Sequence, residues 1–218
     1  MRGLNVITTS LEAGFSCSIG AFAAGPQHKE HEMAHRVCPW WIGYLLASPI
    51  RRWMSESPES LLAPYVRPGM TVLEPGPGMG YFSLPMARAV GSTGRIVAVD
   101  IQPRMLAGLR RRARKAGLLD RIETRLAQPD RMGLDDLRGA VDFALAFAVV
   151  HEMPSPAAFF AEAAAALKPG GTLLFAEPAG HVNPETFATE LEEAQAVGLA
   201  EVSRPSIRRS IAAVLKKV

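Results

Sequence analysis

Three glycines at alternate positions, Gly76, Gly78 and Gly80, follow an apolar run that ends in Glu74. Glycine accepts positive φ and leaves no Cβ between the backbone and a ligand. An apolar helical pattern begins shortly afterwards, which predicts a strand, a tight turn and a helix start that can receive something anionic or polar. Asp100 ends another apolar run, 24 positions after Gly76. A carboxylate there can accept two hydrogen bonds from a ribose diol.

The spacing of the glycines separates two cofactor classes. The dinucleotide fingerprint places glycines first, third and sixth, but the sixth position counted from Gly76 is Tyr81. The pattern acid-x-Gly-x-Gly-x-Gly instead resembles motif I of the class I S-adenosylmethionine (SAM)-dependent methyltransferases. A plain turn in another α/β fold is the alternative, and Asp100 alone does not exclude a nicotinamide cofactor.

Further stretches are similar to the same family. Asp142 to Phe147 resembles motif IV, and Lys168 to Leu173 resembles the turn before the fifth strand. His151-Glu152 stands where many small-molecule methyltransferases of this class carry a His-His or His-Glu pair. The resemblance covers residues 70 to about 187. It implies a methyltransferase of the small-molecule type, similar to the UbiE and arsenite methyltransferase domains, although two cysteines are too few for arsenite chemistry.

The resemblance also implies how SAM is held. Glu74 corresponds to the acid near the methionine amino group, and Asp100 to the acid on the ribose. Many relatives have Gly-Asp-Ala after the third strand, whereas this chain has Ala127-Gln128-Pro129, so only the Gln128 carbonyl oxygen is offered to adenine. The expected cofactor-binding residues are Glu74, Gly76, Gly78, Gly80, Asp100, Ile101, Met105, Gln128 and Phe147.

The implied reaction is an in-line displacement at a methyl carbon on sulfonium sulfur. The protein mainly aligns the reactants, and a base is needed only if the nucleophile loses a proton. The candidate catalytic residues are His151, Glu152, Glu177 and His181. Glu152 has a helix cap or ion pair as its alternative role, and His181 that of a solvated loop residue.

The segment before the core contains a second group of polar and aromatic residues. His28, His31, His35 and Cys38 are spaced three, four and three, which places them on one helix face and is compatible with Zn²⁺. A polar helix face is the preferred interpretation, and no metal is expected. Cys38-Pro39-Trp40-Trp41 and Tyr44 predict an aromatic lid instead. The expected substrate-binding residues are His35, Cys38, Trp41 and Tyr44.

The elements that must position these residues alternate between strands and helices. Strands are predicted at 70–74, 95–100, 121–126, 141–150, 172–176, 200–203 and 209–216, and helices at 57–65, 103–117, 157–167 and 184–197. Alternation of this kind predicts an α/β, Rossmann-like doubly wound sheet, mostly parallel, with an antiparallel C-terminal edge hairpin. The candidate residues then gather at the carboxyl ends of the strands, where ligands bind.

Length and composition limit the remaining organisation. The 218 residues predict a disordered tail (1–27), an N-terminal helical lid (28–66) and a SAM-binding methyltransferase domain (67–218). The tail faintly resembles a secretory signal, and a gene start at Met33 is another alternative. Two cysteines suit a reducing cytosol, so a cytoplasmic location is expected. No apolar run of about 18 residues predicts a membrane span.

The expected function is methyl transfer from SAM to a small molecule, producing S-adenosylhomocysteine (SAH). No Asp/Asn-Pro-Pro-Tyr/Phe run follows the fourth strand, which disfavours amino-methylation of adenine in nucleic acids, and no Pro-Cys pair follows it, which disfavours methylation at cytosine C5. Two alternatives stay open: a non-catalytic SAM-binding sensor or partner subunit, and a nucleic-acid methyltransferase steered by the basic run Arg110 to Lys115. The net charge of +3 does not demand a nucleic-acid partner. The oligomeric state is not predicted.

Overall fold

The computed structural model describes residues 57–218. The predictions for the tail, for most of the helical lid and for the metal-ligand alternative fall on residues 1–56 and lie outside this range. The same holds for the four predicted substrate-binding residues, His35, Cys38, Trp41 and Tyr44.

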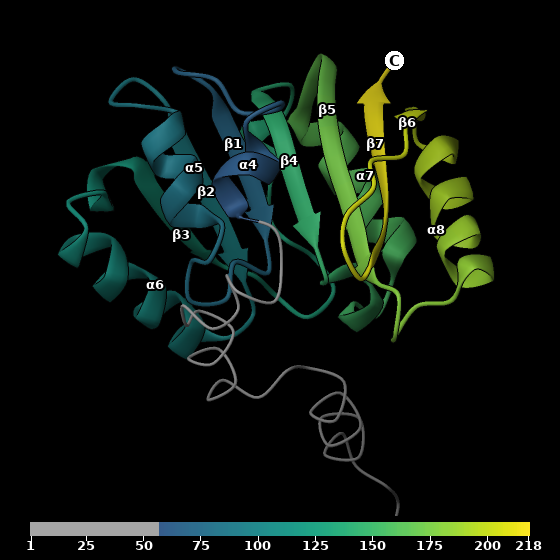
Figure 1. Cartoon of the computed structure of the whole chain (residues 1–218), viewed down its shortest axis with the longest axis horizontal. Coiled ribbons are helices and arrows are strands. Elements are labelled where there is room, and N and C mark those ends of the chain that lie inside the picture. The colour runs from purple at the N-terminus through teal and green to yellow at the C-terminus, as the bar shows by residue number, and fades with distance from the viewer. Residues whose placement is uncertain (1–56) are drawn as a thin grey trace, which may run out of the picture. The chain divides into compact units, whose positions relative to one another are not determined.

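A seven-stranded sheet with the order β3-β2-β1-β4-β5-β7-β6 organises the described residues (Figure 1). Its strands are β1 (Thr71–Pro75), β2 (Arg95–Asp100), β3 (Ile122–Leu126), β4 (Val141–Phe147), β5 (Leu167–Pro178), β6 (Leu199–Ser203) and β7 (Ser210–Lys217). β1 to β5 pair in parallel, and β7 runs antiparallel to β5 and β6. The predicted Rossmann-like sheet with its antiparallel C-terminal hairpin is confirmed.

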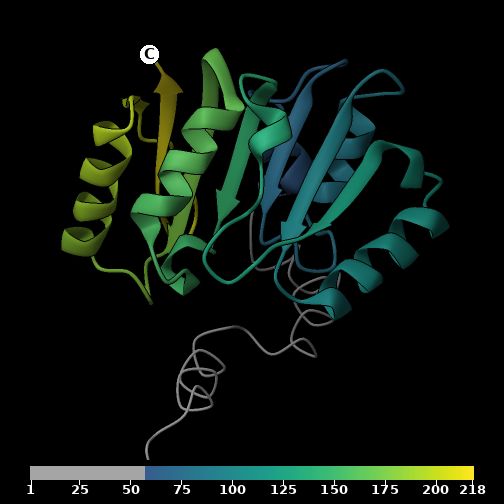
Figure 2. The same cartoon turned by 180° about the vertical axis from the view of Figure 1, so that it is seen from behind.

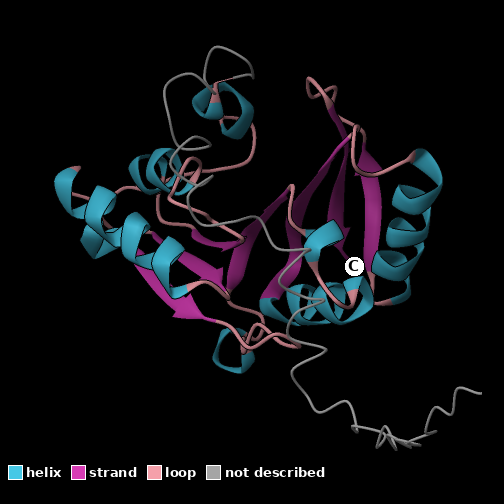
Figure 3. Ribbon diagram, turned by 90° about the horizontal axis from the view of Figure 1, so that it is seen from below, coloured by secondary structure: helices cyan, strands magenta, loops and turns pink. Residues whose placement is uncertain are grey.

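Helices cover both faces of this sheet (Figures 2 and 3). One core cluster contains residues of α4 (Pro58–Leu62), α5 (Ser83–Ala89) and α6 (Pro103–Lys115), and the other contains residues of α7 (Pro156–Ala166) and α8 (Pro184–Ala196). Val72 and Leu73, neighbours in β1, belong to different clusters. Successive strand side chains point to opposite faces, so the apolar strands bury residues on both.

Three of the helices begin with a polar cap followed by proline. The side chains of Ser57, Ser155 and Asn183 accept backbone N–H groups at the starts of α4, α7 and α8. Proline suits the first helical position because its missing N–H would have no helical partner there. The cap and proline signal predicted the start of α4, and the structure places that helix accordingly.

Residues 57–66, the described end of the predicted lid segment, contribute buried side chains to the core. Leu61, Leu62 and Val66 are buried in the core cluster that α5 and α6 share. The ring of Tyr65 stacks on Phe143 of β4 with 5.5 Å between centroids. Residues 57–66 therefore contribute to the packing of the sheet.

Among residues 57–218, every helix is too short or too polar to cross a bilayer.

β4 ends earlier than predicted. The predicted strand continued to Val150, but Ala148 has a φ of +56° and the pairing stops at Phe147. Residues Val150–Glu152 form a short 3-10 turn, η3. Two further turns of this kind are η1 (Leu119–Arg121) and η2 (Asp135–Leu137). The apolar character of the segment did not reveal the turn, because buried turn residues are as apolar as strand residues.

β5 begins earlier than predicted and contains a bulge. Val141 pairs with Leu167 and Phe143 with Thr172, so four residues of β5 stand opposite Asp142 alone. The Asp142 carboxylate accepts the Thr71 N–H at 2.8 Å and a hydrogen bond from Lys168 Nζ within the bulge. Proline and glycine are tolerated in strands at such irregularities. The predicted turn at 168–171 is therefore part of a strand.

Candidate active site

A cavity of about 540 Å³ opens at the carboxyl ends of the parallel strands. Its walls come from the loops after β1, β2, β3 and β4, from α7 and from the start of the loop after β5. The predicted residues that line it are Glu74, Gly76, Gly78, Asp100, Ile101, Met105, Gln128, Phe147, His151, Glu152 and His181. Of the predicted residues that the structure describes, Gly80 and Glu177 do not line the cavity.

The glycine turn combines two closed positions with one open position. Gly76, Gly78 and Gly80 have φ values of +63°, +53° and +84°. A Cβ on Gly76 would lie 2.5 Å from Val149 Cγ2, and one on Gly80 would lie 2.5 Å from Leu109 Cδ1. A Cβ on Gly78 would meet no atom within 4 Å, and Gly78 lines the cavity. Gly78 is therefore where the backbone can be approached by a ligand.

Glu74 lies at the end of β1 and is 3% exposed. Ser83, the first residue of α5, donates from Oγ to Glu74 Oε2 at 2.5 Å. Burial raises the pKa of Glu74 to about 8, the Ser83 hydrogen bond opposes this shift, and the nearby charge of Asp100 adds to it. At neutral pH this carboxyl group holds a proton, which a neighbouring cation would displace. Sequence reasoning missed Ser83, which carries no pattern apart from starting a helix.

Asp100 lies at the end of β2 with its carboxylate on the cavity wall. Oδ1 accepts the Gln102 N–H at 2.8 Å. Burial is the largest influence and raises the pKa of Asp100 to about 6, while backbone N–H groups of Gln102, Gly78 and Ile101 lower it and the charge of Glu152 raises it. The N–H groups fix the direction of the carboxylate beside the glycine turn.

His151 in η3 and Glu177 near the end of β5 form a pair. Glu177 is fully buried, and its Oε1 accepts the Val150 N–H at 2.8 Å and the His151 N–H at 3.4 Å. Its Oε2 is hydrogen-bonded to His151 Nδ1. This hydrogen bond is the main cause that raises the pKa of His151, while burial lowers it. Glu177 thus acts on the cavity only through His151.

Aromatic rings form two groups on the wall of the cavity. The His181 ring centroid lies 5.7 Å from that of His151, at an interplanar angle of 70°. Phe82 contacts Tyr81 and Phe147 with centroid distances of 4.9 and 4.8 Å. All five residues line the cavity. Tyr81 and Phe82 follow the glycine turn directly, a position from which sequence reasoning could have included them.

The loop after β3 supplies the wall beside Asp100. Gln128 lines the cavity, and its Oε1 accepts a hydrogen bond from Arg131 Nε at 3.2 Å. The backbone N–H of Gln128 donates to the Arg131 carbonyl at 3.0 Å, which closes a tight tip. The Gln128 side-chain oxygen that was predicted to contact adenine thus already accepts a hydrogen bond from Arg131.

A parallel α/β sheet with a glycine turn after β1 and an acid at the end of β2 is typical of proteins that bind an adenosine-type cofactor at the carboxyl edge of the sheet. Residues 73–175 match the family model described as a methyltransferase domain. This region therefore resembles a class I SAM-dependent methyltransferase domain, a family whose methyl donor is SAM.

Relatives whose names indicate different methyl acceptors share this domain. The chain is 35% identical over 155 residues to the ribosomal protein L11 methyltransferase of Pelotomaculum thermopropionicum, covering 70% of this chain and 45% of that protein. It is 28% identical over 170 residues to the ubiquinone/menaquinone biosynthesis C-methyltransferase UbiE of Brucella suis, covering 75% and 62%. The chain thus spans less than two thirds of either relative. A SAM-dependent methyltransferase from Aquifex aeolicus shares the fold, with a TM-score of 0.74, 22% identity and coverage of 84% and 100%.

The residues of the cavity fit SAM chemically. Gly78 leaves open space beside the turn. Asp100 presents a carboxylate fixed by backbone N–H groups, which suits hydroxyl donors, and Glu74 presents a carboxyl group that a cation would ionise. Ile101 and Met105 add apolar walls.

Proposed function

We propose that the protein transfers a methyl group from SAM to a small molecule, releases SAH, and removes the acceptor's proton with His151. The observation that carries this proposal is that His151, on the wall of a cavity rich in apolar side chains, is hydrogen-bonded to the buried Glu177 behind it. When bound, SAM supplies an electrophilic methyl group. The side chains of this protein align the acceptor and take its proton, which are the tasks that such a reaction leaves to the enzyme.

The cofactor side of the cavity is assigned to residues of β1, β2 and their loops. Asp100 accepts hydrogen bonds from the ribose hydroxyls, because its carboxylate lies on the wall and is already oriented by Gln102. Glu74 takes the amino group of the methionine part. Ile101 and Met105 contact the ribose and the adenine. The burial of both acids supports this assignment, since hydrogen bonds to charged groups are stronger away from water.

The acceptor side is assigned to η3, β5 and the loop after β5. Glu177 Oε1 already accepts two N–H groups, so Oε2 acts as the acceptor and His151 Nδ1 as the donor. In the neutral imidazole the lone pair then lies on Nε2, the nitrogen that can take a proton. This favours acceptors whose oxygen or nitrogen nucleophile carries a hydrogen. Phe82, Phe147 and Met153 line the same cavity and favour an acceptor that is apolar apart from this nucleophilic group.

Three other functions have less support. A sensor that only binds SAM does not need an imidazole fixed in one tautomer, which supports catalysis. Nucleic-acid methylation would use the basic run on α6, but residues Arg110 to Lys115 do not line the cavity. A protein acceptor is the third alternative, and its support is the similarity to the ribosomal protein L11 methyltransferase.

The test is a transfer assay with radiolabelled methyl-SAM and three acceptor pools. The pools are small phenols and amines, total RNA, and ribosomal protein. Label is expected in the small-molecule pool, and His151→Ala should abolish it while SAH binding by calorimetry persists. Label that enters RNA or protein alone would overturn the proposal, as would binding of SAH without transfer to any pool.

A further inference from the structure

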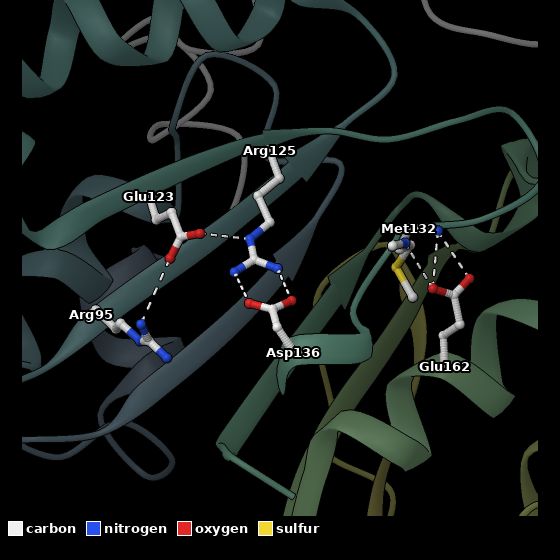
Figure 4. A network of polar contacts seen from close by, with 7 residues as sticks. Arg95, Glu123, Arg125, Met132, Asp136 and Glu162 are labelled. Atoms are coloured by element: carbon white, nitrogen blue, oxygen red, sulfur yellow. Dashed lines mark hydrogen bonds and ion pairs between the residues drawn. The ribbon is translucent and has the colours of Figure 1, made fainter. Parts of the chain in front are cut away.

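Glu162 is the one charged residue of α7, whose other residues are alanine, phenylalanine and proline. Its carboxylate binds backbone N–H groups of the loop after β3 (Figure 4). Oε1 accepts the Met132 N–H at 2.9 Å, and Oε2 accepts the N–H groups of Met132 and Gly133 at 3.1 and 3.0 Å. One carboxylate thus holds two consecutive amides. Such charge-assisted hydrogen bonds are roughly twice as strong as neutral ones.

The loop that Glu162 holds forms one wall of the cavity. Six consecutive residues, 127–132, line the cavity, and Glu162 lines it too. The first residue of the loop is fixed, because the Ala127 N–H donates to the Asp100 carbonyl at 3.0 Å. Its far end is fixed by the buried side chains of Met132 and Leu134 in the core cluster of α7 and α8. Between these ends the tip at 128–131 is exposed.

A second anchor of the same segment lies away from the cavity. Arg125 of β3 makes two hydrogen bonds to Asp136 of η2, at 2.6 and 2.7 Å, and one to Glu123 at 2.7 Å (Figure 4). Arg95 extends this chain of charges with a contact to Glu123 at 3.8 Å. None of these four residues lines the cavity. The two anchors therefore differ in position while holding the same loop.

We propose that Glu162 is a positioning residue for the cofactor, which it affects by holding the 127–133 loop as a wall of the cavity. This inference rests on the proposed placement of SAM in the cavity. Gly133 has a φ of +72° and leaves the backbone many alternative conformations, so the loop depends on the hydrogen bonds at 132 and 133 to keep one of them. Loss of the carboxylate leaves both N–H groups without this acceptor, and the wall relaxes away from the ligand.

The test measures SAH affinity by calorimetry in four variants. Glu162→Ala is expected to raise the Kd about tenfold, the scale of one charge-assisted hydrogen bond. Glu162→Gln keeps the shape and one acceptor oxygen, so it should restore part of the affinity. Asp136→Asn, which weakens the distant anchor, should stay within about twofold of the wild type, the effect typical of exposed ion pairs. Asp100→Ala serves as the reference for the cofactor placement.

A second readout follows the loop itself. Trypsin can cleave after Arg131 at the exposed tip, so cleavage at this bond without ligand should be faster in Glu162→Ala than in the wild type or in Asp136→Asn. SAH should protect the wild type most. If Glu162→Ala does not fold, the nearly isosteric Glu162→Gln carries both measurements.

Three results would overturn the inference. If folded Glu162→Ala binds SAH as the wild type does while Asp100→Ala is weakened, Glu162 does not position the cofactor although the placement of SAM stands. If Asp136→Asn weakens binding as much as Glu162→Ala, general loop stability explains the effect. If Asp100→Ala also binds normally, both the cofactor placement and the inference fall.

Discussion

Glu74 and Glu177 are both buried acids at the carboxyl edge of the sheet, yet their surroundings differ. Glu177 on β5 accepts two backbone N–H groups and is hydrogen-bonded to an imidazole. Among residues 57–218, Glu74 on β1 receives one hydrogen bond, from Ser83, and burial raises its pKa to about 8. Burial disfavours a carboxylate and donors favour it. Glu177 is therefore engaged by His151 within the protein. Glu74 can instead lose its proton when a cationic ligand binds.

The same contrast extends to the neighbouring residues. Asp100 beside Glu74 also has its pKa raised by burial, to about 6. Ligands that bring hydroxyl and ammonium donors suit such a pair. Near β5 the donors to Glu177 are N–H groups of η3, and Glu177 in turn orients the His151 ring. Perturbed titratable groups concentrate at functional sites, and here Glu74 and Asp100 line the cavity from β1 and β2 whereas His151 lines it from η3.

The strongest test of the contrast is His151→Ala. If β5 and η3 serve the acceptor, kcat should fall about 10²–10⁴-fold, the usual contribution of a general base. SAH affinity should change less than about twofold, because no cofactor contact is assigned to His151. Calorimetry and a methyl-transfer assay measure the two quantities. His181→Ala, which removes the neighbouring ring, is the matched control and should lower kcat by a smaller factor. Loss of SAH binding in folded His151→Ala would remove the division between the two sides.

Asp100→Ala tests the cofactor side. SAH binding should weaken by about 1.5–3 kcal/mol, the usual worth of hydrogen bonds to a charged group. Asp100→Asn keeps one acceptor oxygen and should lose less. Calorimetry at pH 7 gives both values, with thermal unfolding as the check on folding. Unchanged affinity in Asp100→Ala would make this residue a structural cap for the segment that follows β2.

Glu177→Gln tests whether His151 is the base, through the pH dependence of kcat/KM. His151 acts as a base only when it is neutral, so kcat/KM should rise as the pH passes through its pKa and level off above it. Glu177 raises that pKa most, with smaller contributions from Glu152 and Glu190. Removing the Glu177 charge should therefore move the rise to lower pH and lower the plateau. A pH–rate profile that does not move would show that another group limits the rate.

Glu74→Gln tests the proposed change of charge on the other side. At pH 7 the Glu74 carboxyl is mostly protonated, because its pKa is about 8. Binding of an ammonium group favours the carboxylate, so SAM binding should release close to one proton and strengthen with pH up to about 8. Calorimetry in buffers of different ionisation enthalpy measures this release. In Glu74→Gln the release should vanish, and a release that persists would place the titration elsewhere.

The sequence predicted the sheet, because apolar runs, glycine turns and capped helix starts each have a local signal. It also placed Glu74, Asp100 and His151 at one edge, since parallel strands bring their carboxyl ends together. It could not distinguish the part that Glu177 plays, because the contact with His151 joins residues 26 positions apart. Glu162 had one signal, a single charge in an alanine-rich helix. The bulge in β5 had none, because a turn and a strand irregularity use the same glycine and proline.

The smallest predicted effect concerns Glu190 of α8, which shares the surroundings of the His151–Glu177 pair. It is 4% exposed, and its Oε2 has no hydrogen-bond partner among the described residues. Burial first, and then the charge of Glu177, raise its pKa from 4.5 to about 7. The buried Oε2 without a donor therefore favours the protonated carboxyl group of Glu190 up to about pH 7.

A raised carboxyl pKa means that the folded protein holds a proton that the unfolded chain loses above about pH 4.5. The wild type therefore loses stability relative to a neutral variant as the pH rises from 4.5 to 7, and the difference is constant above. The Tm of Glu190→Gln minus that of the wild type should grow over this range and then level off. Glu192→Gln, at an exposed position of the same helix, is the control and should show no such trend. Scanning calorimetry at pH 5, 6, 7 and 8 measures it. An equal difference at pH 5 and pH 8 would mean that Glu190 titrates normally, and the contrast between donor-rich and donor-poor acids would not extend to α8.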